Sequence, residues 1–256
     1  MQPELLSKFK NLKLTELDLA PTGAGVYAWY SRPQIGTPDW RRNLDADGCD
    51  TGESAFRRLL AKHSSRFMPP ALRTEAHSVF RDTWTGRLSP SRYEKHVAAI
   101  SDPALLDSES GNIMFPRESI QSLLSSEKQR ARLSELLTSI AIPLLSSPLY
   151  IGRAENLRVR LLDHAHALGK WNSLVQRDPS HRDRLREVLF SGVSNADLPD
   201  TFATRAIAAG FGPDNLTVYV LDIREIFKVS DDSAIELSEA FEWFLNTWNR
   251  PLLGRA

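Results

Sequence analysis

The sequence predicts an α+β fold, in which a small three-stranded mixed sheet is flanked by helices and interrupted by a large, mainly helical insertion. Two segments, residues 24–30 and 215–223, are rich in the aromatic and β-branched residues that favour strands. A third, shorter apolar segment at residues 148–152 has the length of a strand. About 120 residues separate the first segment from the third, and much of that stretch shows helix-like apolar spacing.

In the first predicted strand, AGVYAWY at residues 24–30, the aliphatic Val26 and Ala28 alternate with the aromatic Tyr27 and Trp29. The turn residues 21–23 precede it. A loop rich in proline, glycine and aspartate follows at residues 31–52. Helical patterns then lie at residues 54–63, 70–83, 89–100 and 116–140. The last is the clearest, because its leucines and isoleucines recur at helical spacing and Pro116 suits a first turn.

The remaining elements follow the strand at residues 148–152. A helix is predicted at 155–168, with Asn156 suited to its N-cap, and shorter helices at 179–190 and 201–209. The strand NLTVYVLDI comes next, and a final helix at 232–249 begins at an Asp-Ser cap and ends before Pro251. We therefore predict three segments: the N-terminal part with the first core strand (1–30), the helical insertion (31–147) and the remainder of the core (148–256).

Composition is that of a globular protein, with 41% hydrophobic and 25% charged residues in a chain of 256. No apolar run has the length of a signal peptide or a membrane span, which predicts a cytoplasmic protein without a membrane partner. Net charge is zero, but residues 55–96 hold nine basic against three acidic side chains. Local fields govern binding to a polyanion, so this segment, with Arg57 and Arg58, is predicted to contact phosphates. The alternative is that its arginines coat exposed helix faces.

Two predicted strands contain the related triplets Gly25-Val26-Tyr27 and Tyr150-Ile151-Gly152. Arg160 lies ten residues after Tyr150, and His164 follows four residues later, so both side chains share one helix face. Glu242 lies on the final helix, nine residues before Pro251.

These features resemble the GIY-YIG nuclease superfamily, whose two signature triplets are followed by such an arginine, histidine and glutamate. The resemblance covers residues 24–30 and 148–254, and residues 31–147 lie outside it. It implies a metal-dependent endonuclease that hydrolyses phosphodiester bonds of DNA with Mg²⁺ or Mn²⁺, in a restriction, antiphage, mobile-element or repair context. A hydrated Mg²⁺ held by one carboxylate suits such chemistry.

The resemblance also implies roles for individual residues. Glu242 is the metal ligand, and Arg160 binds a phosphate oxygen and opposes charge in the transition state. Tyr27 is the base or a proton relay, while His164 is the base instead or orients that tyrosine. The implied catalytic residues are Tyr27, Tyr150, Arg160, His164 and Glu242. Gly25, Gly152 and Arg153 are assigned to substrate binding. Arg57 and Arg58, which lie outside the resemblance, are added to them on the local positive charge alone.

One position departs from the family pattern: members often carry an asparagine about three residues after the proline, and Gly254 stands here. The alternative function is therefore a catalytically impaired GIY-YIG domain that binds nucleic acid or a protein. For the insertion two roles are open: it binds DNA beside the cleavage site, or it binds a protein partner. Cutting both strands would need two active sites and hence a homodimer.

Overall fold

The computed structural model describes residues 8–67, 72–77, 83–88, 122–140, 146–190, 199–249 and 251–254. Contacts divide the chain into two compact units. The first unit comprises residues 1–32, 141–189 and 194–256, and the second comprises residues 33–140 and 190–193. No helix of the described residues is long and apolar enough to cross a membrane.

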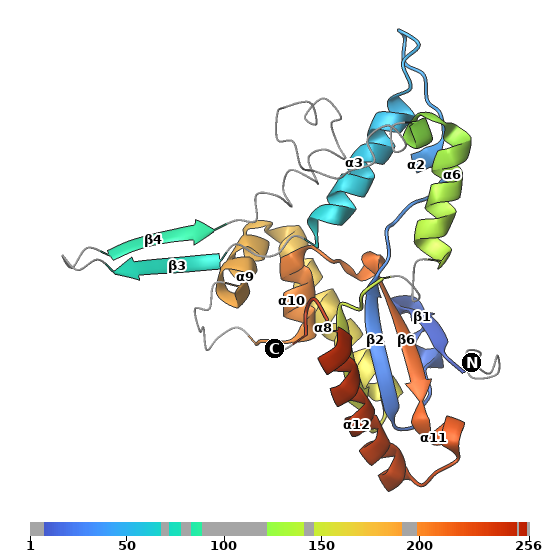
Figure 1. The fold of residues 1–256 in the computed structure, drawn as a ribbon, viewed down its shortest axis with the longest axis vertical. Helices are drawn as coiled ribbons and strands as arrows, with labels where there is room; N and C mark the ends of the chain where they lie inside the picture. The colour runs from blue at the N-terminus through green and yellow to red at the C-terminus, as the bar shows by residue number, and fades with distance from the viewer. Residues whose placement is uncertain are drawn as a thin grey trace. The chain divides into compact units, whose positions relative to one another are not determined.

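A four-stranded antiparallel sheet forms the centre of the first unit (Figure 1). Its order is β1 (Lys10–Lys13), β6 (Leu216–Asp222), β2 (Gly25–Ser31) and β5 (Tyr150–Ala154). The α+β class is confirmed, but the predicted three-stranded mixed sheet was wrong in strand number and direction, because every neighbouring pair is antiparallel. β1 was missed because, of its four residues, only Leu12 is buried, so the segment shows no alternating pattern.

Strand register places the aromatic side chains of the two signature triplets on one face of the sheet. On β5, Gly152 lies opposite Tyr27 and Tyr150 lies opposite Trp29. Residues directly opposed in an antiparallel pair project to the same side, and side chains two apart in a strand share a face. Tyr27, Trp29 and Tyr150 therefore project from the same face, toward His164 and Phe202.

The helix α8 (Leu157–Arg177) covers that face and packs against β2, β5 and α10 (Phe202–Ala209). Its N-cap is Asn156, as predicted, whose side chain accepts a hydrogen bond from the Val159 amide at 3.1 Å. Leu157, Leu161 and Leu168 form its buried stripe. The helix extends beyond the predicted end at residue 168, and α9 (Ser180–Phe190) follows it.

The C-terminal part of the first unit contains η4 (Pro213–Asn215), α11 (Ile223–Phe227) and α12 (Asp231–Asn249), while η1 (Leu14–Leu19) follows β1. α12 packs against β2 and β5 through a face that includes the buried Ala234 and Ser238. Its other side carries exposed aromatic rings: the Trp243 and Phe244 centroids lie 4.9 Å apart, and the Phe244 and Trp248 centroids 5.3 Å apart. Glu242 thus lies between a core face and an exposed aromatic face of one helix.

The second unit contains α2 (Thr37–Trp40), α3 (Thr51–Ser65), α6 (Glu127–Glu135) and η3 (Leu136–Ile140). These helices confirm the predictions at residues 54–63 and for most of 116–140; the predicted start at 116–121 lies outside the described residues. The predicted helix at 70–83 was wrong where it can be compared, because β3 (Leu72–His77) pairs with β4 (Thr83–Leu88). Threonine and tryptophan in β4 favour a strand. The predicted helix at 89–100 lies outside the described residues.

Arg130 is the buried polar centre of the second unit, with a fully buried side chain. Its guanidinium donates to the Trp40 carbonyl at 2.9 Å, the Leu124 carbonyl at 2.7 Å and the Asp50 carboxylate at 2.8 Å. Asp50 is also the N-cap of α3, where it accepts from the Gly52 amide. One arginine therefore joins α2, α6 and the start of α3.

Replacing Arg130 with methionine should lower the free energy of unfolding of the second unit by about 1–3 kcal/mol, because the buried Leu124 carbonyl, the Trp40 carbonyl and the partly exposed Asp50 carboxylate lose a hydrogen-bond donor. Hydrogen exchange at the amides of α3 and α6 measures this directly. Arg132→Met, at an exposed position of the same helix, is the control and should leave exchange unchanged. Unchanged protection of α3 in Arg130→Met would show that Arg130 does not stabilise this unit.

Candidate active site

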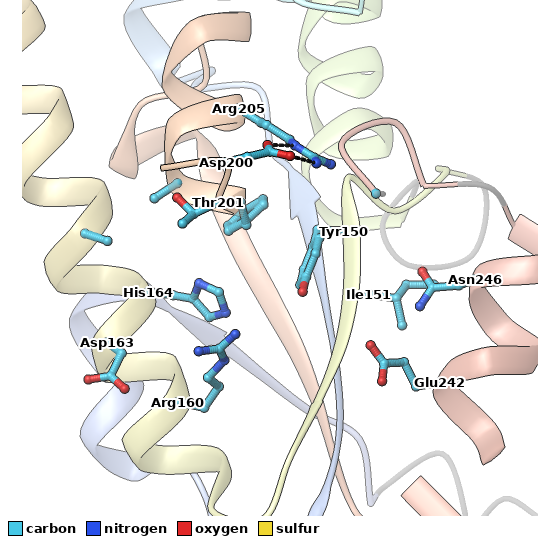
Figure 2. A pocket seen from close by; sticks show the side chains of 14 residues that line it. Tyr150, Ile151, Arg160, Asp163, His164, Asp200, Thr201, Arg205, Glu242 and Asn246 are labelled. Atoms are coloured by element: carbon cyan, nitrogen blue, oxygen red, sulfur yellow. Dashed lines mark hydrogen bonds and ion pairs between the residues drawn. The ribbon is translucent and has the colours of Figure 1, made fainter. Parts of the chain in front are cut away.

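A cavity of about 510 Å³ in the first unit brings together four of the five predicted catalytic residues. Tyr150 from β5, Arg160 and His164 from α8, and Glu242 from α12 all line it. Figure 2 shows Tyr150, His164 and Arg160 converging from one side, while Glu242 and Asn246 project from α12 on the other. The fifth residue, Tyr27, lies in the wall behind them, with only 1% of its surface exposed.

The Tyr27 hydroxyl and the His164 Nε2 atom are 2.8 Å apart and form a buried hydrogen bond. Both rings lie within an aromatic cluster that includes Tyr150, Trp29 and Phe202. This packing fixes the orientation of the phenol and the imidazole before any substrate binds.

Burial raises the pKa of Tyr27 well above its usual value, and the nearby Tyr150 raises it further. The neighbouring Arg160 guanidinium opposes this rise through its hydrogen bond and its charge. A free Tyr27 phenolate is therefore unfavourable at neutral pH, since the ordinary pKa of a tyrosine is already near 10. This favours a relay role for Tyr27 over a role as an ionised base.

His164 has the opposite property: burial, and then the positive charge of Arg160, lower its pKa from 6.5 to about 4. The imidazole is therefore neutral at pH 7, and its Nε2 atom can accept the proton of the Tyr27 hydroxyl. A proton can therefore pass between these two groups along a hydrogen bond that is already formed.

We expect the His164 ring to remain neutral from pH 7 down to about pH 5 in NMR titration, because its folded pKa is about 4. The signal is assigned by its loss in His164→Gln. Since the unfolded chain takes up this proton near pH 6.5, the group stabilises the fold fully above that pH and progressively less as pH falls toward 4. His63 in the second unit has a similarly low pKa, about 4, so a global stability measurement would not isolate His164. A titration midpoint at or above pH 6 would contradict the buried, neutral ring.

Glu242 is one of three carboxylates that line the cavity, with Asp163 and Asp200, and 25% of its side chain is exposed. The pKa of Glu242 is raised above its usual value, mainly because burial disfavours the charged form. The positive charges of Arg153 and Arg160 oppose this rise, and the negative charge of Glu239 adds to it. A cation bound beside this partly buried carboxylate would stabilise its charged form. Among the described residues no group of three histidines, cysteines or acids could hold a metal ion. A hydrated Mg²⁺ or Mn²⁺ keeps several of its waters, so the one cavity carboxylate on α12 is a sufficient protein ligand for it, whereas a closed zinc site needs four protein ligands.

Arg153, whose contact with phosphate stays a prediction, joins β5 to α12 in this structure. Its guanidinium lies 3.2 Å from the Glu239 carboxylate and 3.5 Å from that of Glu242. The side chain is about one-third exposed, so the pair with Glu242 is accessible to solvent. Arg153 therefore reduces the negative charge beside the cavity without closing it.

The glycines of the two triplets lie where any larger residue would clash with a neighbouring atom. A Cβ atom on Gly152 would lie 2.6 Å from the Tyr27 hydroxyl oxygen, and one on Gly25 would lie 2.1 Å from the Leu221 carbonyl oxygen. Neither position can hold a side chain without moving β2, β6 or Tyr27. The structure thus gives both glycines a packing role, and their predicted contact with substrate stays a prediction.

Arg57 and Arg58, also predicted to bind phosphate, lie on α3 of the second unit. Arg57 is 5% exposed and pairs with Glu53 at 2.7 Å, so its guanidinium is already neutralised and turned away from solvent. This burial argues against a phosphate contact for Arg57. Arg58 is exposed, and its Nε donates to the Ser54 carbonyl at 3.3 Å, which leaves the prediction open for that residue alone.

Further residues of the cavity were missed by the sequence analysis. Asp200, Thr201 and Arg205, at the start of α10, form its far wall, with Arg205 paired to Asp200 at 2.6 Å (Figure 2). Arg205 also donates to the Leu253 carbonyl at 2.9 Å, which fixes the C-terminal segment beside the cavity. Gly254 lines the cavity there, at the position where the resemblance leads one to expect an asparagine. Asn246 lies one helical turn after Glu242, a spacing that could have identified it.

Comparison with known proteins gives no independent assignment: no family model, curated protein or solved structure matches the chain. The geometry of the cavity and the resemblance of the sequence motifs are therefore the grounds for a function.

Proposed function

We propose that the chain is a metal-dependent endonuclease that hydrolyses phosphodiester bonds of DNA in the cavity between α8, α12 and β5. The observation that carries the proposal is the buried Tyr27–His164 hydrogen bond, set in the wall of a cavity that also presents Arg160 and Glu242. A proton acceptor, a fixed positive charge and a carboxylate that can hold a metal ion are the groups that this kind of phosphodiester hydrolysis requires.

In the proposed reaction a water molecule attacks phosphorus and loses a proton to the Tyr27 oxygen. Tyr27 passes its own proton to His164 Nε2, which becomes protonated, so the tyrosine never ionises fully. The bond from phosphorus to the leaving nucleoside oxygen breaks, and that oxygen takes a proton from solvent. His164 then returns its proton to solvent through Tyr27, which restores the starting state.

Arg160 opposes the negative charge that develops on the phosphate oxygens, since it lies in the cavity beside Tyr27. Glu242 would hold the divalent cation, which when bound neutralises phosphate charge and lowers the pKa of a coordinated water. The Tyr150 side chain borders the cavity and could bind the phosphate or the attacking water.

Incubation of the purified chain with supercoiled plasmid tests the proposal. Nicking is expected with Mg²⁺ or Mn²⁺ and is expected to disappear with a chelator. Binding of DNA without any cleavage, with both metal ions and on several substrates, would contradict the proposed endonuclease activity.

That outcome would favour the alternative, a GIY-YIG domain that binds nucleic acid or a protein without cutting. Two observations favour this alternative: Gly254 contributes no polar side chain to the cavity, and Arg153 already neutralises part of the charge of Glu242.

A further inference from the structure

We propose that Asn246 is the second protein ligand of the cation held by Glu242, through its side-chain oxygen. This inference rests on the proposed function and names a residue to which neither the motifs nor the resemblance assigns a role.

The two residues are four apart on α12, and both line the cavity. Residues at this spacing lie one above the other on one helix face, which is the arrangement by which a helix offers two ligands to one ion. Figure 2 shows the Asn246 amide directed into the same space as the Glu242 carboxylate.

The Asn246 side chain is partly buried, yet it has no hydrogen-bond partner among the described residues. Asn249, three residues later, differs in both respects: it is exposed, and its amide donates to the Leu245 carbonyl at 2.9 Å. A half-buried amide without a partner retains its full capacity to bind a ligand.

The charges around the cavity favour the oxygen of this amide as the binding atom. Glu242 and Glu239 lie on the same side of α12, and Arg153 offsets only one of their two negative charges, so a phosphate would still be repelled there unless a cation lay between. Mg²⁺ and Mn²⁺ prefer oxygen ligands and retain several waters, so one carboxylate and one amide oxygen form an adequate protein contribution. A neutral ligand also adds no further repulsion of the phosphate.

Direct measurement of Mn²⁺ binding to the whole chain, by the electron paramagnetic resonance signal of free Mn²⁺, tests the inference without relying on activity. Asn246→Ala is expected to weaken Mn²⁺ binding about tenfold, a typical cost of losing one contributor to a metal site. Asn246→Asp keeps the oxygen and should bind Mn²⁺ at least as tightly as the natural chain, which also keeps the test valid if the alanine variant is unstable. Asn249→Ala is the matched control and should bind normally.

The outcomes separate this inference from the function it rests on. Normal Mn²⁺ binding by Asn246→Ala, with loss of binding by Glu242→Gln, would overturn the role of Asn246 and leave the proposed nuclease intact. Absence of saturable Mn²⁺ binding by the natural chain would overturn both. Weakened binding by Asn246→Ala and by Glu242→Gln, with recovery in Asn246→Asp, would support both.

Discussion

Replacing Glu242 with glutamine is expected to reduce the rate of DNA cleavage by about a thousandfold, because the cavity loses the carboxylate that would hold the cation. The substitution preserves the size of the side chain, and the residue is only partly buried, so the fold should be retained. Initial nicking rates on plasmid DNA, with the natural chain measured in parallel, give the comparison.

Glu239→Gln is the matched control for this prediction. Glu239 lies on the same helix, shares the Arg153 partner and is 66% exposed, but it does not line the cavity. It should retain most of the activity. Equal losses in the two variants would mean that the charge of α12, rather than a ligand at Glu242, governs the rate.

Replacing Arg160 with alanine is expected to lower the turnover rate by about 10²–10³, since the transition state loses its fixed positive charge. Removing Arg160 also removes the charge that opposes the rise in the pKa of Tyr27 and that helps to depress the pKa of His164. The pKa of His164 should therefore move upward in this variant, although burial still holds it below 6.5. Single-turnover rates and the histidine NMR titration together measure both effects.

Lys170→Ala provides the control, because Lys170 is an exposed basic residue of the same helix that does not line the cavity. Arg160→Lys should restore part of the rate, as a lysine supplies charge without the planar fork. If Arg160→Ala leaves turnover unchanged and only weakens DNA binding, Arg160 is a binding residue and not a catalytic one.

The secondary-structure positions of the site residues could be predicted from sequence, because they depend on local patterns. Tyr27 and Tyr150 were placed on strands by composition, while Arg160 and His164 were placed on one face by their spacing. The cavity brings these residues together with Glu242, although their chemical roles stay predictions.

Other features could not be predicted because they depend on tertiary contacts. The far wall formed by Asp200 and Arg205 comes from a helix that carries no recognisable motif, and Arg205 is held there by the C-terminal backbone. Burial of Arg57 depends on the packing of α3 in the second unit, which its basic sequence does not reveal. β3 was mistaken for part of a helix at residues 70–83, because a six-residue strand offers little periodicity to distinguish it from a helix.

Cleavage of plasmid DNA in water enriched in ¹⁸O, with Mg²⁺ or Mn²⁺, tests the central claim most directly. The account predicts one ¹⁸O atom in the new terminal phosphate for each bond cut, with no product when the cation is removed or Glu242 is replaced by glutamine. Intact DNA after incubation of the natural chain with either cation, or cleavage that leaves the new phosphate without ¹⁸O, would contradict it.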